Sequence, residues 1–204
     1  MNHLEKFSLL LKIVQSLEYI RSEKQASPCG ETHLQKAVFL MQELTDQPLG
    51  FKFVIYKHGP YSFDLNDELG WMFSYNLLDA TPVEIAPDQY QGFKLFLTDA
   101  GKNLLHDSKE TLSHFQSQID FAANLIGHKN VLALEKLTTA LFLKTKRKKN
   151  TSEETAQYLN RLKPHISVAD ALKALQEADH LIRESNQKFQ QKNPQNSENQ
   201  LLVT

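Results

Sequence analysis

The stretch that decides the fold is Phe51-Lys52-Phe53-Val54-Ile55-Tyr56-Lys57-His58-Gly59-Pro60-Tyr61-Ser62. Its first half is rich in aromatic and β-branched side chains, which predicts a short buried strand. Gly59 can adopt a positive φ, and Pro60 disfavours helical backbone at the residue before it, so the chain is expected to turn sharply here. Ser62 is a candidate N-cap for a following helix. The turn carries three side chains with an apolar body and a polar tip: Tyr56, His58 and Tyr61.

Helical periodicity continues on both sides of this stretch. Apolar side chains recur every three or four residues from His3 to about Ser22 and from Thr32 to Leu44, which predicts two helices before the strand. The polar side of the second helix is expected to consist of His33, Gln35, Lys36 and Gln42. A third helix is expected from Ser62 to about Leu78, with a core face formed by Leu65, Leu69, Met72, Phe73 and Leu77.

The chain after this helix predicts a hairpin and then further helices. Val83–Ala86 and Phe93–Leu97 are expected to be two strands, joined by a turn-forming connection. The predicted helices then begin near Thr98, Leu112, Val131, Thr151 and Ser167. Thr151-Ser152-Glu153-Glu154 has the pattern of a capping box, so the start of that helix is the most strongly specified.

These elements predict an α+β fold that is mainly α. Residues 1–110 are expected to form a helical module with a short strand and a winged-helix-like β-hairpin. Residues 111–190 are predicted to be a helical extension. Residues 191–204 are rich in Asn, Gln and Ser and are predicted to be a disordered tail.

The charge is unevenly distributed along the chain. Residues 1–110 hold 10 Lys and Arg against 15 Asp and Glu, whereas residues 111–204 hold 13 against 9. An acidic surface repels phosphate backbones, so the first half is a poor general binder of nucleic acid.

Neither a covalent crosslink nor a membrane anchor is expected. The single cysteine, Cys29, excludes an internal disulfide and a cysteine-based metal site. No apolar run approaches the ~20 residues of a membrane helix, and no signal peptide is expected, so a cytoplasmic location is predicted.

The sequence contains no recognisable catalytic motif, and neither a cofactor nor a metal ion is predicted. His58 has no second histidine or carboxylate at a ligand spacing beside it. Two readings of the turn stay open: a structural turn, or a binding surface formed by Lys36, Tyr56, His58, Tyr61, Asp64 and Asp67. A hydrolase that uses His58 is a third, weaker alternative.

A basic run lies at the end of a predicted helix: Lys144, Lys146, Arg147, Lys148 and Lys149. Cations are favoured at helix C-termini, so a solvated helix end explains this run. The alternative is a phosphate-binding patch. No aromatic side chains are interleaved with these residues, which disfavours stacking on single-stranded nucleic acid.

The third helix and the hairpin also suggest a DNA-binding winged helix. The would-be recognition helix contains Asp64, Asp67 and Glu68 but no Lys or Arg, whereas base-reading helices normally bring basic or amide side chains to the groove. A strand and a turn also separate it from the second helix, and a helix-turn-helix needs a short turn there.

The segments His33-Leu34-Gln35-Lys36 and Tyr56-Lys57-His58-Gly59-Pro60-Tyr61-Ser62 together resemble the YwgA group, which is similar to the SocA-like antitoxins or Panacea-domain proteins. The resemblance covers about residues 4–105, with Ala37 where relatives usually carry Leu. It implies a small regulatory module that binds a protein partner, a toxin in the antitoxin cases. Members are also labelled predicted transcriptional regulators, so the alternative is a DNA-binding regulator, dimeric through its C-terminal helices.

Overall fold

The computed structural model of the chain describes residues 1–45, 47–83, 92–146 and 150–189. Within these ranges it contains nine helices and two antiparallel hairpins, which confirms the predicted mainly helical α+β class. The elements are α1 (His3–Glu23), α2 (Glu31–Leu44), β1 (Val54–Tyr56), β2 (Gly59–Tyr61), α3 (Phe63–Ser74), β3 (Leu78–Val83), β4 (Gly92–Leu97), α4 (Asp99–Asp107), α5 (Lys109–Ser113), α6 (Gln116–Ile126), α7 (Val131–Lys146), α8 (Ser152–Leu162) and α9 (Val168–Phe189).

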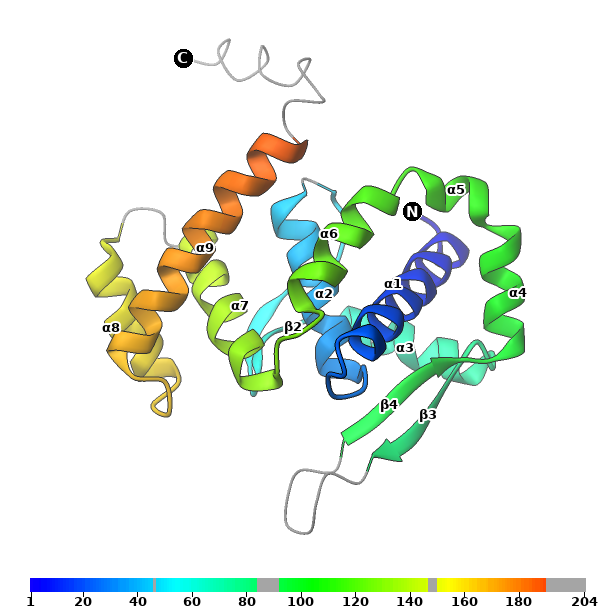
Figure 1. The fold of residues 1–204 in the computed structure, drawn as a ribbon, viewed down its shortest axis with the longest axis horizontal. Coiled ribbons are helices and arrows are strands. Elements are labelled where there is room, and N and C mark those ends of the chain that lie inside the picture. The colour runs from blue at the N-terminus through cyan, green and yellow to red at the C-terminus, as the bar shows by residue number, and fades with distance from the viewer. Residues whose placement is uncertain (46, 84–91, 147–149, 190–204) are drawn as a thin grey trace.

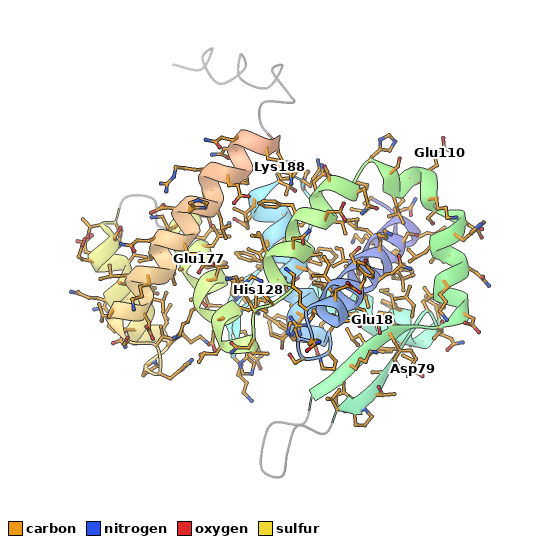
Figure 2. The ribbon with its side chains drawn as sticks, viewed as in Figure 1. Glu18, Asp79, Glu110, His128, Glu177 and Lys188 are labelled. Atoms are coloured by element: carbon orange, nitrogen blue, oxygen red, sulfur yellow. The ribbon has the colours of Figure 1, made fainter. Side chains whose placement is uncertain are left out.

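Helices from both halves of the chain share one core. α6 packs against α1 and α2, and α7 packs against α2, β2 and α9. Figure 1 shows α6 between α1 and α7, with α2 behind it and α8 and α9 at the far side of α7. The hairpin of β3 and β4 lies beside α1, on the side of Glu18 (Figure 2). Lys94 of β4 pairs with Glu18 at 2.7 Å. The later helices α6 and α7 pack directly on α1 and α2, so these contacts do not mark a boundary at residue 110. The division into domains there stays a prediction.

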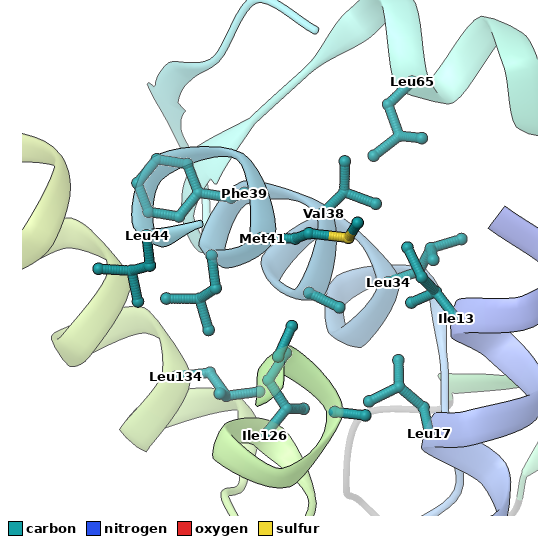
Figure 3. Close-up of a cluster of buried hydrophobic side chains, with 14 of the residues drawn as sticks. Ile13, Leu17, Leu34, Val38, Phe39, Met41, Leu44, Leu65, Ile126 and Leu134 are labelled. Atoms are coloured by element: carbon teal, nitrogen blue, oxygen red, sulfur yellow. The ribbon is translucent and has the colours of Figure 1, made fainter. Parts of the chain in front are cut away.

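The core is formed by fully buried aliphatic and aromatic side chains. Figure 3 shows side chains of α1, α2, α6 and α7 converging, among them Ile13, Leu34, Met41, Ile126 and Leu134. Burying each such side chain stabilises the fold by about 1.5–3 kcal/mol relative to leaving it in water. Of the helices in the described ranges, each is either too short or too polar to cross a bilayer.

Residues 33–41 of α2 are all buried, contrary to the expected polar face. His33, Gln35 and Lys36 are each less than 5% exposed, and Gln42 is half-buried. Periodicity alone does not reveal this burial, because elements distant in the sequence, among them α6, α7 and β2, pack against α2. Gln35 and Lys36 then satisfy backbone groups of the covering hairpin instead of water.

The segment from Phe51 to Ser62 is a two-stranded hairpin and not the single buried strand that was predicted. Val54 pairs with Tyr61 and Tyr56 pairs with Gly59, which leaves Lys57 and His58 at the turn. The turn occurs where expected, with Gly59 at a φ of 89°. β1 is largely exposed: Val54 and Tyr56 are exposed and Ile55 is half-buried.

Two further boundaries differ from the predictions. α3 ends at Ser74 because Asn76 adopts a left-handed conformation (φ 54°), so Leu78 begins β3 and Phe73 is 40% exposed instead of buried. β3 therefore precedes the strand expected at Val83–Ala86, and residues 84–86 lie outside the described residues, as does the predicted tail at 191–204.

Two predicted helix starts are confirmed by their caps. The Ser62 hydroxyl accepts a hydrogen bond from the Leu65 amide at 3.3 Å. Thr151 and Glu154 form the predicted capping box, with reciprocal bonds of 3.2 and 2.9 Å. Each cap satisfies amide groups that would otherwise have no partner within the helix.

Candidate functional site

The hairpin of β1 and β2 is held in place by polar side chains of α2. The Gln35 amide donates to the Ser62 carbonyl and accepts from the Ser62 amide, both at 3.0 Å. Lys36 Nζ donates to the Pro60 carbonyl at 2.7 Å. Lys36 is only 1% exposed, so it anchors the hairpin from below and is not part of the exposed surface, contrary to the prediction.

Burial lowers the pKa of Lys36 to about 8, while the Glu135 carboxylate opposes this shift. Below pH 8 the folded protein must hold a buried ammonium group, whereas the unfolded chain keeps that charge in water up to pH 10.5. The unfolded state therefore binds more protons between these values, and stability rises with pH. Relative to Lys36→Met, the wild type should gain about 3 kcal/mol in free energy of unfolding across this interval.

Urea unfolding at pH 7 and at pH 10.5 measures this difference. Cys29 and Tyr61 titrate in the same range but are present in both proteins, so their contributions cancel in the comparison. Parallel pH dependences of the wild type and Lys36→Met would show that Lys36 stays solvated.

A buried carboxylate on α7 holds the other side of the turn. Glu135 pairs with Lys163 Nζ at 2.8 Å, and Lys163 also donates to the carbonyl groups of Tyr56 (2.7 Å) and Lys57 (2.5 Å). The second carboxylate oxygen lies 3.3 Å from His165 Nε2 and 4.0 Å from His58 Nδ1. The Glu135 and Lys163 side chains are less than 10% exposed, so the pair connects α7, the end of α8 and the turn in a largely water-excluded place.

Glu135 and Lys163 were not among the predicted site residues. The only signal was a carboxylate at Glu135 beside Leu134 and Leu137 on the buried face of a helix. His58, in contrast, was predicted as a binding residue, and the structure directs its ring toward Glu135. Burial lowers the pKa of His58, and the Glu135 carboxylate opposes that shift. The described residues contain no group of His, Cys, Asp and Glu side chains suited to a metal ion.

Three aromatic rings project from this anchored hairpin. Tyr56, Tyr61 and Phe63 contact one another with ring centroids 5.1–5.7 Å apart. Tyr56 and Phe63 are more than 50% exposed, and a contiguous group of exposed large apolar side chains is typical of an interaction surface. Burial raises the pKa of Tyr61 to about 12, and the Glu31 carboxylate, which accepts a hydrogen bond from the phenol, acts in the same direction. We call Tyr56, Tyr61 and Phe63 the aromatic cluster.

The exposed side of α3 continues this surface. Asp64, Asp67, Trp71 and Tyr75 follow at intervals of three and four residues, so they lie along one side of the helix. The Trp71 and Tyr75 rings are stacked with centroids 6.2 Å apart, and each is more than half exposed. We call these four residues the α3 outer face. Trp71, Tyr75 and Phe63 were not among the predicted site residues, although aromatic residues at solvent-facing helix positions were a usable signal.

The structure pairs the first two residues of the basic run with carboxylates of the same chain. Lys144 Nζ lies 2.7 Å from Asp179, and Lys146 Nζ lies 3.9 Å from Glu43. These two lysines therefore face carboxylates, which weakens the predicted phosphate-binding patch. The other predicted members, Arg147, Lys148 and Lys149, lie outside the described residues.

No protein-family model matches the chain, and no curated protein is detectably similar to it. The resemblance to the YwgA and Panacea proteins therefore stays a prediction that rests on the residues quoted for it.

Proposed function

We propose that this protein is a non-catalytic regulatory protein that acts by binding another protein through the aromatic cluster and the α3 outer face. The observation that carries the proposal is the set of exposed aromatic rings on a backbone anchored by buried side chains. Tyr and Trp dominate the energetics of protein interfaces, since each buries a large area and loses little conformational freedom. A rigid support reduces the entropy lost on binding further.

The charge of this surface indicates the chemistry of its partner. α3 contains Asp64, Asp67 and Glu68 but no Lys or Arg, and Glu68 is buried against Lys6 at 3.0 Å. The exposed charge that remains is negative, so a partner surface with Lys or Arg beside apolar side chains fits best. An antitoxin- or defence-associated role in the cytoplasm is the form of this proposal that the family resemblance supports.

The same features disfavour the alternative of a DNA-binding regulator. The negative side of α3 would face the phosphates of a duplex, and the β1–β2 hairpin separates α2 from α3. A gel-shift titration with random duplex at low salt tests this alternative. Tight, salt-sensitive retardation would replace our proposal, and an unshifted duplex would agree with it.

The proposal is tested by photo-crosslinking in the native host. A photoreactive phenylalanine analogue at Phe63 should crosslink one abundant protein, and the same analogue at Tyr19 should not. Tyr19 is 68% exposed on α1 and belongs to neither part of the proposed surface, so it is the matched control. Equal crosslinking yields at the two positions would contradict a dedicated contact surface.

Once the partner is purified, Trp71→Ala should weaken its binding about 30-fold or more, because a central Trp typically contributes 2 kcal/mol or more at an interface. Tyr56→Ala should act in the same direction, and Tyr19→Ala should leave the dissociation constant unchanged. Trp71 is the single tryptophan of the chain, so its fluorescence in the wild type should shift to shorter wavelength as the partner covers it. An unchanged emission spectrum at saturation would place the interface elsewhere.

A further inference from the structure

A pocket of about 490 Å³ lies between the start of α2, the inner side of α3 and the β3–β4 hairpin. Its walls are mainly apolar and include Pro28, Leu69, Phe73, Val83, Phe93 and Leu95. This volume is within the ordinary range for small-molecule sites, which combine apolar walls with a few polar groups. The pocket belongs to neither the aromatic cluster nor the α3 outer face.

The polar end of the pocket is the first turn of α2. The N-cap residue Gly30 has no side chain that could accept from the first amide groups, and Glu31 and Thr32 line the pocket. A side chain at position 30 is excluded, because its Cβ would lie 2.7 Å from the Phe93 carbonyl oxygen. The start of a helix carries partial positive charge, which favours an anionic group here.

His33 supplies a second, independent indication of a ligand at this end. His33 is one of the residues that line the pocket, and it is 4% exposed. Nδ1 accepts a hydrogen bond from the Gly30 amide at 3.2 Å, and burial lowers the pKa of His33 to about 3, so the neutral ring carries its hydrogen on Nε2. Among the described residues Nε2 has no hydrogen-bond partner. A buried donor without an acceptor is costly, and a ligand oxygen would satisfy it.

The charge around this end also favours an anion. Arg21 is 2% exposed and donates to Ser27, which lines the pocket, and to the carbonyl groups of Ile126 and Lys129. In the described part of the chain no carboxylate lies within ion-pairing distance of Arg21, so its charge is not neutralised by an acidic side chain. Glu31 opposes an anion, but it is exposed and interacts with the Tyr61 phenol.

We propose that this pocket binds a small apolar carboxylic acid, with the carboxylate at the first turn of α2 and the apolar body between α3 and the hairpin. This inference is independent of the proposed protein partner. A regulatory protein with such a site would respond to a metabolite of this class.

Calorimetric titration with 4-phenylbutyrate tests the proposal. The wild type should bind this probe saturably, with a dissociation constant below about 1 mM for a ligand of this size. The neutral amide 4-phenylbutyramide should bind about 10-fold more weakly or worse, since it lacks the charge that the helix terminus favours. No saturable binding of the acid, or equal binding of acid and amide, would overturn the proposal.

Two variants locate the site. Gly70 lines the pocket, and a Cβ added there would meet nothing within 4 Å, so the side chain of Gly70→Leu can occupy the pocket. Leucine also has a higher helix propensity than glycine, so the melting temperature should stay at or above that of the wild type while binding is lost. His33→Asn keeps an acceptor near the position of Nδ1 and removes Nε2, and should weaken binding about 10-fold.

Ser74→Leu is the matched control, because it adds the same side chain to an exposed position of the same helix outside the pocket lining. It should bind 4-phenylbutyrate like the wild type. Amide chemical shifts provide a readout that does not depend on any variant: the probe should perturb Glu31, Thr32 and Gly92. Retained affinity in Gly70→Leu, or shift changes confined to other regions, would overturn the assignment.

Discussion

Lys163→Met should lower the free energy of unfolding by about 3–5 kcal/mol, because it removes one partner of a buried ion pair. Glu135 would keep a buried negative charge without its closest cationic partner. The carbonyl groups of Tyr56 and Lys57 would lose the donor that now reaches both of them. Urea unfolding monitored by circular dichroism measures the loss.

Lys102→Met is the matched control, since Lys102 pairs with Asp99 at 2.8 Å but both side chains are well exposed. Exposed pairs contribute about 0–1 kcal/mol, so this variant should be close to the wild type. The double variant Glu135→Leu/Lys163→Met should recover part of the loss, because it leaves neither charge buried alone. Equal, small effects of the two lysine variants would mean that the Glu135–Lys163 pair is hydrated and contributes little.

Gly59→Ala should destabilise the fold by about 3 kcal/mol or more, through a strained backbone and a steric overlap together. Gly59 has a φ of 89°, which side chains rarely tolerate. An added Cβ would also lie 2.9 Å from Thr139 Oγ1 and 3.2 Å from Thr138 Oγ1. The melting temperature and the urea midpoint should both fall.

Gly50→Ala separates the two causes, because Gly50 has a similar φ of 83° and a Cβ there would meet nothing within 4 Å. It should cost about 1 kcal/mol, the contribution of the backbone alone. The Thr139 hydroxyl has no hydrogen-bond partner among the described residues, so Thr139→Ala should partly rescue Gly59→Ala. If Gly59→Ala and Gly50→Ala proved equally destabilising, the close contact with α7 would be excluded.

The sequence was sufficient to predict those elements that local patterns specify. The apolar repeat at three- and four-residue spacing predicted α1, α2 and α7, and side-chain caps predicted the starts of α3 and α8. The turn at Gly59-Pro60 was also predicted correctly, because both residues restrict the backbone by themselves. Tyr56 and Tyr61 were predicted as partner-binding residues; the structure brings their rings together in the aromatic cluster, and their binding role stays a prediction.

The rest depends on contacts between residues far apart in the chain. Lys163 lies 107 residues after Tyr56, whose carbonyl it binds, and nothing near either residue indicates the other. Lys36 was expected in solvent because Lys is usually exposed, but the hairpin that folds over α2 buries it. Local patterns also carried no signal for the pocket, since three separate segments enclose it.

The bond from Lys163 to the turn has a consequence for the order in which the protein matures. During synthesis, the N-terminal segment leaves the ribosome long before position 163 does, and until then the backbone around Tyr56 lacks its final donor. A chain truncated before α8 would contain every residue of the proposed contact surface and yet present it in a different shape. Competence for recognition would therefore be acquired only after position 163 has been synthesised and has emerged.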